Sequence, residues 1–132
     1  LEYGHVKLRE QLGLLSGPVE EFQKSATAEH NAMLNMLVEE GYLDKAALDD
    51  EAANENEIVD ALYRGLKGSP CKLMAASIVD AVGEKRTQNQ PGTNNEYPNW
   101  RIPLADVEGN VVPLEKLFDE PRLQEITAIM RG

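Results

Sequence analysis

The clearest pattern of apolar and polar positions covers residues 27–40. Met33, Leu37 and Gly41 follow one another at intervals of four. This spacing predicts an amphipathic helix, because side chains four positions apart share one helical face. Gly41 stands where such a helix commonly ends, since glycine adopts left-handed backbone angles without strain. We therefore expect a helix that stops at Gly41.

Other helical segments are expected on both sides of this one, each bounded by glycine or proline. They cover residues 1–15, a short segment that starts at Pro18, residues 54–66, and two C-terminal segments that start at Pro113 and at 119–121. In the segment 54–66, Asn54 and Glu57 have the spacing of a capping box. Asp60 and Arg64 have the spacing of a favourable ion pair within a helix.

Residues 71–82 fit two different structures. Met74, Ile78 and Val82 recur every four residues, which favours a helix. Residues 73–77 also form a short apolar run, which is typical of a buried strand. Periodicity does not decide between the two, and both remain open.

The stretch 89–101 excludes a regular helix and a central strand. Its two prolines remove backbone donors, and Gly92 admits backbone angles that other residues resist. Tyr97 and Trp100 carry large apolar surfaces with polar tips, which usually find both packing and a hydrogen-bond partner. We expect an ordered loop that covers another part of the protein.

These elements together predict five or six helices and little strand. The fold class is therefore mainly α with one or two short strands. At 132 residues, the chain has the length of one domain with a core of its own. We expect residues 1–132 to form a single unit.

The charge balance excludes some classes of partner. The chain has 13 basic and 23 acidic residues and a formal net charge of −10. Nucleic-acid binding depends on Lys and Arg that neutralise phosphates, so no nucleic-acid partner is expected. An anionic membrane surface is excluded on the same ground, and no run of 18 apolar residues is present. The single cysteine favours a reducing compartment, so we expect a cytoplasmic protein.

Cysteine chemistry and metal binding find little support in the sequence. A nucleophilic Cys71 would need a nearby base, and neither His5 nor His30 belongs to a recognisable cysteine-enzyme signature. These three residues also lack the spacing of zinc ligands. We expect Cys71 to be buried and inert beside Pro70, with no metal site and no cofactor.

Other candidate chemistry is equally weak. The acidic stretch 43–53 lacks the glycine and the alternating ligands of a calcium loop. Pro91-Gly92-Thr93 has no following lysine, so it is no phosphate loop. Asp80 and Glu96 are the acids with the most apolar or aromatic neighbours. We expect both to be hydrogen-bonded structural acids.

The loop also carries a recognisable signature. Residues 88–93 read Gln-Asn-Gln-Pro-Gly-Thr, and residues 96–101 read Glu-Tyr-Pro-Asn-Trp-Arg. This pair resembles the C-terminal signature of the 4-α-glucanotransferases, the amylomaltase or disproportionating-enzyme family. Looser resemblance, in order and spacing, extends upstream to the last helices and the strand of that family. It covers essentially the whole chain and is most specific at the signature loop, residues 88–101.

The resemblance implies a retaining transglycosylase that acts on α-1,4-glucans and maltooligosaccharides by a double displacement. Its scaffold would be a (β/α)₈ barrel, which takes about 250 residues. The chain would then be the C-terminal part of the barrel, isolated as a helical fragment. The family's catalytic acids would lie upstream of the matched residues, so we expect no catalytic residue here and no activity from the fragment alone.

The resemblance also implies roles for six loop residues. The family's Asn-x-Pro-Gly loop borders the active-site cleft and contacts sugar, and it corresponds to Asn89, Pro91 and Gly92. A turn-capping role for Asn89 is the alternative. Tyr97, Trp100 and Arg101 are expected to anchor the loop to the barrel, and stacking on sugar is the alternative. Gln90 stands where relatives often carry an apolar residue.

A non-catalytic helical interaction or structural module is the competing hypothesis. If the chain is a barrel fragment, four apolar residues would normally pack on the missing part of the barrel: Met33, Leu37, Ile58 and Leu62. Large exposed apolar faces mark interaction sites. We expect the fragment to bury these residues between its own helices or in a homo-oligomer.

Overall fold

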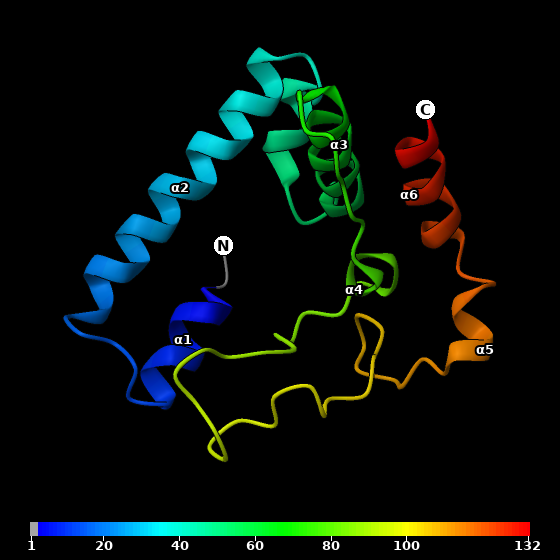
Figure 1. The fold of residues 1–132 in the computed structure, drawn as a ribbon. Coiled ribbons are helices and arrows are strands. Elements are labelled where there is room, and N and C mark those ends of the chain that lie inside the picture. Colours follow the sequence, from blue (N-terminus) through cyan, green and yellow to red (C-terminus); the bar gives the residue numbers. More distant parts are fainter. Residues whose placement is uncertain (1–2) are drawn as a thin grey trace. The chain divides into compact units, whose positions relative to one another are not determined.

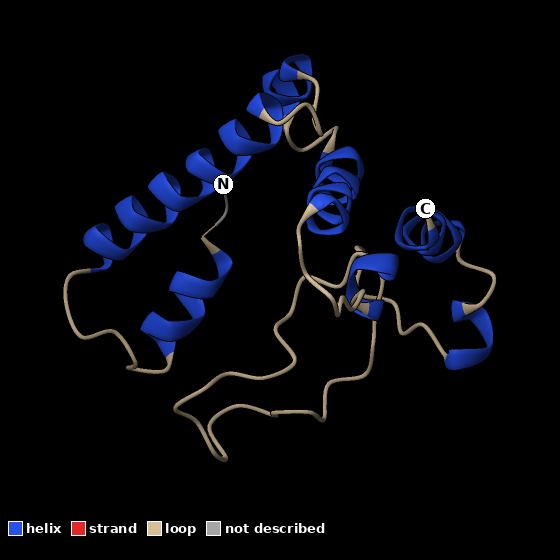
Figure 2. Cartoon of the chain, turned by 45° about the horizontal axis from the view of Figure 1, so that its top comes forward, coloured by secondary structure: helices blue, strands red, loops and turns tan. Residues whose placement is uncertain are grey.

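The computed structural model describes residues 3–132 and is mainly helical (Figures 1 and 2). The helices in chain order are α1 (Gly4–Gln11), α2 (Val19–Glu39), the 3₁₀ helix η1 (Lys45–Asp50), α3 (Glu55–Gly68), α4 (Ile78–Val82), α5 (Leu114–Leu117) and α6 (Pro121–Arg131). Within the described residues, the β structure amounts to one antiparallel bridge between Ala105 and Val111. The predicted fold class is confirmed. No helix in this part of the chain is both long enough and apolar enough to span a bilayer.

The chain divides into two compact units. The first contains residues up to Met33 together with Arg86–Ile102, and the second contains Leu34–Lys85 and Pro103–Gly132. The candidate loop 88–101 belongs to the first unit, and most of the helices belong to the second. That both units belong to one catalytic barrel, as the resemblance implies, stays a prediction.

In the first unit, α1 lies beside the beginning of α2 (Figure 1). The hydroxyls of Tyr3 and Thr27 are 2.8 Å apart. The Arg9 guanidinium lies 5.7 Å from the centre of the Phe22 ring, a cation–π contact. Val6 is buried on the same side of α1. The helix predicted for 1–15 is therefore present but shorter, and its first two residues lie outside the described residues.

The two helices predicted from Pro18 and over 27–40 are one continuous helix, α2, of 21 residues. The prediction of a break between them was wrong. Polar side chains near the expected break are satisfied inside the helix: Thr27 Oγ1 donates to the Gln23 carbonyl at 2.9 Å. Ser25 Oγ donates to Glu29 Oε1 at 3.2 Å. Weak helix formers are tolerated here because their hydroxyls have partners.

The end of α2 is confirmed at Gly41, whose φ is 75°. The Tyr42 N–H donates to the Leu37 carbonyl at 2.8 Å, and the Gly41 N–H donates to the Val38 carbonyl at 3.1 Å. This pair of bonds is a Schellman motif, which satisfies carbonyls that the helix end would otherwise leave unpaired. It turns the chain so that Leu43 becomes buried.

The core of the second unit lies between α3, α4 and α6 (Figure 1). Tyr63, Ala81 and Ile126 are its buried centre. Four partly buried apolar residues pack around them: Val59, Leu123, Ile129 and Met130. The helix predicted from 119–121 is thus present as α6, and it buries one apolar face.

Polar contacts fasten α6 to α3 at both ends. Near its start, Arg122 Nη2 lies 2.9 Å from Asp60 Oδ1, and Arg122 Nη1 lies 2.7 Å from Glu125 Oε2. Burial opposes the charge of Arg122, yet the hydrogen bonds that it donates to Asp60 and Glu125 hold its pKa above the ordinary value. Near its end, Lys67 Nζ donates to the Ile129 carbonyl at 3.1 Å.

The predicted capping box at the start of α3 was wrong. Asn54 occupies the N-cap position, but its side chain makes no capping bond. Its Nδ2 instead donates to the carbonyls of Asp50 at 2.9 Å and Ala47 at 3.3 Å. These acceptors belong to η1, so the asparagine amide closes the preceding helix rather than opening the next one. The predicted Asp60–Arg64 pair is present at 3.9 Å.

Residues 73–77 are neither helix nor strand. Leu73 is 93% exposed, and α4 begins only at Ile78. A strand needs hydrogen bonds from a neighbouring strand, and the described residues supply none here. Cys71 is exposed, so the prediction that it is buried was wrong. All five residues of the run 73–77 are exposed in the described part of the chain.

The segment after α4 forms a small hairpin around Asp106. Gly83 ends α4 with a φ of 72°, and a Cβ at this position would overlap the Val107 side chain. Asp106 Oδ1 accepts from the Asn110 N–H at 2.9 Å and from the Glu108 N–H at 3.0 Å. The Asn110 backbone and then its side-chain amide lower the pKa of Asp106. The Gly109 N–H donates to the Asp106 carbonyl at 3.0 Å, which closes the turn before the Ala105–Val111 bridge.

The four apolar residues expected to be covered differ in burial. Leu37 and Ile58 are buried, whereas Met33 and Leu62 are partly buried. Leu37 and Ile58 are therefore covered by other residues of the chain itself. Homo-oligomer formation stays a prediction.

Candidate functional site

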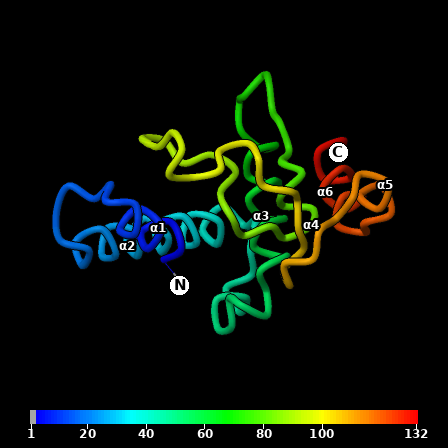
Figure 3. Tube along the Cα trace, turned by 90° about the horizontal axis from the view of Figure 1, so that it is seen from below, coloured from blue at the N-terminus to red at the C-terminus, as the bar shows by residue number. Residues whose placement is uncertain are grey.

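The signature loop 88–101 contains no helix or strand, and its two ends are joined (Figure 3). The Trp100 N–H donates to the Gln88 carbonyl at 2.8 Å. The Tyr97 hydroxyl donates to the Thr87 carbonyl at 2.6 Å. Because both bonds link the start of the loop to its end, the loop is ordered by its own contacts. The predicted order of the loop is confirmed, whereas its covering of another part of the protein stays a prediction.

A tight turn forms the centre of the loop at Pro91 and Gly92. The Thr93 N–H donates to the Gln90 carbonyl at 3.3 Å, which closes the turn. Pro91 and Gly92 are the two central residues, and the φ of 88° at Gly92 matches the position where a type II turn requires glycine. A Cβ at Gly92 would also lie 3.3 Å from Leu14 Cδ2. Glycine is needed here for conformation and for space.

The side chain of Asn99 holds this turn from the other arm of the loop. Its Oδ1 accepts from the Gln90 N–H at 2.7 Å. Its Nδ2 donates to Thr93 Oγ1 at 2.9 Å. Thr93 Oγ1 in turn donates to the Gln90 carbonyl at 2.7 Å. Sequence reasoning gave Asn99 no role, although its place inside the signature was a signal that could have been followed.

The structure brings the three predicted sugar-contacting residues together at one exposed turn. Asn89, Pro91 and Gly92 are all exposed. The Asn89 carbonyl accepts from Thr87 Oγ1 at 2.9 Å, which fixes the backbone just before the turn. Neighbouring Gln90 is buried, and its Nε2 donates to the Pro91 carbonyl at 3.2 Å. A buried polar side chain thus supports the turn.

The three predicted anchors differ in how they are placed. Tyr97 fastens the loop through its hydroxyl, as described above. Trp100 is 76% exposed and has a positive φ of 58°, and its contact within the loop is the backbone bond to the Gln88 carbonyl. Arg101 is exposed, and its N–H donates to the Pro98 carbonyl at 3.0 Å. Anchoring by the side chains of Trp100 and Arg101 stays a prediction.

The two acids singled out in the sequence both have structural partners. Glu96 Oε2 accepts from the Asn94 N–H at 2.7 Å, and this bond lowers the pKa of Glu96. Asp80 Oδ2 accepts from the Tyr63 hydroxyl at 2.5 Å. In the described part of the chain, no group of three or more His, Cys, Asp or Glu residues is arranged to hold a metal ion.

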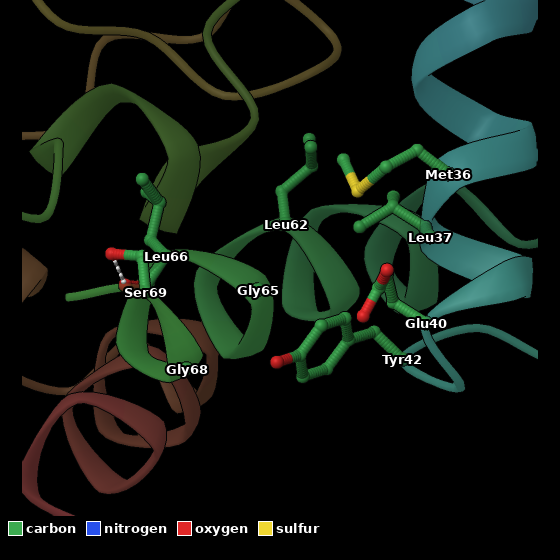
Figure 4. A pocket seen from close by; sticks show the side chains of 9 residues that line it. All are labelled: Met36, Leu37, Glu40, Tyr42, Leu62, Gly65, Leu66, Gly68 and Ser69. Carbon is green, nitrogen blue, oxygen red and sulfur yellow. Dashed lines mark hydrogen bonds between the residues drawn. The ribbon is translucent and has the colours of Figure 1, made fainter.

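The second unit contains a pocket of about 400 Å³ between the end of α2 and α3 (Figure 4). The Tyr42 ring lies against Gly65 and Gly68, where any larger side chain would meet it. The lining is mostly apolar and consists of Met36, Leu37, Glu40, Tyr42, Leu62, Gly65, Leu66, Gly68 and Ser69. None of the residues predicted to contact sugar lines this pocket.

Comparison with known proteins decides the family. The family model described as 4-alpha-glucanotransferase matches residues 15–108, which include the whole signature loop. The chain belongs to the 4-alpha-glucanotransferase family. The resemblance seen in the signature is therefore confirmed across most of the chain.

Relatives in this family cover nearly all of the chain. The 4-alpha-glucanotransferases of Mycobacterium bovis and Mycobacterium tuberculosis are each 44% identical over 127 residues, 96% of this chain. The 4-alpha-glucanotransferase of Haemophilus influenzae is 27% identical over 122 residues, 90% of this chain. The chain spans only 17% of the length of each of these relatives. No solved structure matches the chain significantly.

Proposed function

We propose that this chain is part of a 4-alpha-glucanotransferase that transfers α-1,4-glucan segments between maltooligosaccharides. The observation that carries the proposal is the family match over residues 15–108, together with the 44% identity to mycobacterial relatives. The reaction would be a retaining double displacement: an enzyme carboxylate displaces one sugar, and the 4-hydroxyl of an acceptor sugar then displaces the carboxylate. We place the carboxylates that perform it outside these 132 residues.

The contribution of this chain would be one wall of the glucan site. Asn89, Pro91 and Gly92 form an exposed turn that is already held by hydrogen bonds, so little order has to be gained when sugar binds. The Asn89 amide offers both a donor and acceptors to sugar hydroxyls. Gly92 leaves room for the backbone to approach a ligand.

The exposed, single Cys71 accords with a reducing compartment, and the cytoplasm is the proposed location.

Glucose release from maltotriose tests the proposal. The full-length protein that contains this chain should convert maltotriose into glucose and longer maltooligosaccharides, because each transfer of a maltosyl unit leaves one glucose behind. The 132-residue chain alone should release none. A full-length protein that leaves maltotriose unchanged would favour a helical structural module, and activity in the 132-residue chain would refute our placement of the catalytic acids.

A further inference from the structure

The peptide unit between Asn89 and Gln90 is held on both sides. Its carbonyl, from Asn89, accepts from Thr87 Oγ1 at 2.9 Å. Its N–H, from Gln90, donates to Asn99 Oδ1 at 2.7 Å. A peptide plane with both polar groups bonded has little freedom to rotate. These two bonds fix the orientation of the peptide plane that directly follows the Asn89 Cα.

Asn99 also holds the far side of the turn. Its Nδ2 donates to Thr93 Oγ1, which donates onward to the Gln90 carbonyl. Asn99 and Thr93 are half-buried and Gln90 is buried, so water competes poorly for these bonds. One amide side chain therefore closes both ends of the segment that contains Pro91 and Gly92.

We propose that Asn99 is a positioning residue for glucan binding, which acts through the turn and does not touch the sugar. This inference rests on the proposed function, because it assumes that the turn contacts glucan. Without the Asn99 side chain, the Asn89–Gln90 peptide could rotate, and a binding-competent turn would be only one of several conformations. Affinity falls in proportion to the fraction of molecules in the competent conformation.

Substitutions in the full-length protein test this role, with steady-state kinetics on maltotriose. Asn99→Ala should raise KM about tenfold and lower kcat less than about threefold, because the lost order affects binding in the ground state as much as in the transition state. Thr93→Val should raise KM by a smaller factor. Thr93→Ser keeps the hydroxyl and should behave like the wild type. Asn95→Ala changes another exposed asparagine of the loop and is the matched control.

The double variant Asn99→Ala/Thr93→Val shows whether Asn99 and Thr93 affect KM through their shared hydrogen bond or independently of each other. Both substitutions break the same bond between Asn99 and Thr93, so their effects on KM should combine to less than the product. A KM for Asn99→Ala within twofold of that for Asn95→Ala would overturn the inference, as would equal losses in Thr93→Ser and Thr93→Val.

Two further outcomes are informative. If Asn99→Ala does not fold, Asn99→Asp replaces it. Asp keeps the acceptor for the Gln90 N–H and loses the amide donor, so KM should rise less than tenfold. An unchanged KM in both Asn99→Asp and Thr93→Val would overturn the positioning role of Asn99. An inactive wild-type protein would overturn the proposed function, and an active wild type with insensitive Asn99 variants would overturn this inference alone.

Discussion

The Tyr63 hydroxyl donates a 2.5 Å hydrogen bond to Asp80 and accepts one of 2.9 Å from the Ser77 N–H. Tyr63 lies on α3, and Asp80 lies on α4, so the two bonds connect the helices. Ser77 is the last residue before α4, at the end of the exposed run 73–77. The Tyr63 hydroxyl therefore holds the backbone at Ser77, where the exposed run 73–77 leads into helix α4.

Removal of this hydroxyl should destabilise the second unit. Tyr63→Phe keeps the buried ring but leaves the Asp80 carboxylate and the Ser77 N–H without this partner. Bonds to charged groups contribute about 1.5–3 kcal/mol, so we expect a loss of about 2 kcal/mol in the free energy of unfolding, measured in urea. Tyr97→Phe removes an exposed hydroxyl and should cost less than about 1 kcal/mol. Equal losses would contradict the importance of the buried pair.

The same bonds predict a dependence of stability on alkaline pH. Burial and then the Asp80 hydrogen bond raise the pKa of Tyr63 above its ordinary value of 10.0. The folded state therefore holds the proton more tightly than the unfolded state. This contribution is fully present below pH 10 and is lost as the pH rises from there through the pKa of the folded state. The difference in stability between wild type and Tyr63→Phe should shrink above pH 10, and a constant difference up to pH 12 would contradict the prediction.

Two arginines share the carboxylate of Asp60, and they should contribute unequally. The Arg122 side chain is 16% exposed and lies 2.9 Å from Asp60, whereas that of Arg64 is 47% exposed and lies 3.9 Å away. Arg122→Met leaves a largely buried carboxylate without its close partner, so a loss of about 2–3 kcal/mol is expected. Arg64→Met should cost less than about 1 kcal/mol. Thermal unfolding of both variants checks this, and a reversed order would refute it.

Gly83 should tolerate a side chain less well than Gly109. Both have positive φ, so alanine at either position strains the backbone by roughly 1–2 kcal/mol. At Gly83 the added Cβ would also overlap Val107, while nothing lies near a Cβ at Gly109. We expect Gly83→Ala to lose more stability, and Val107→Ala in the same chain to recover the difference. Unfolding in urea measures both, and no recovery would show that Val107 is not the obstacle.

Substitution of Asn89 tests its proposed contact with sugar. In the full-length protein, Asn89→Ala should raise KM for maltotriose about tenfold, which corresponds to the loss of one hydrogen bond of about 1.4 kcal/mol. Asn95→Ala in the same exposed loop should leave KM within twofold of the wild type. If both variants retain the wild-type KM, Asn89 only shapes the turn.

Helix ends could be predicted wherever one residue decides the backbone locally. Gly41 ends α2 and Pro121 begins α6, in each case through the angles that the residue permits or imposes. The continuity of α2 could not be predicted, because it depends on hydroxyl partners that appear only once the helix exists. The state of 73–77 depends on neighbouring strands, which no property of those five residues reveals.

The site could be predicted only as far as it is local in sequence. Asn89, Pro91 and Gly92 meet because they occupy one turn. Asn99 lies six and nine residues from its partners Thr93 and Gln90, and neither separation corresponds to a helical or strand repeat. Its role becomes visible only when the loop has closed.

The exposed run 73–77 also bears on how this sequence can evolve. Packing within the chain places little demand on Leu73, so selection for the fold of these 132 residues alone would let that position drift. A preference for an apolar residue there would point to contacts outside these 132 residues. The set of residues that position 73 accepts in the full-length protein would therefore show whether this exposed segment is covered there.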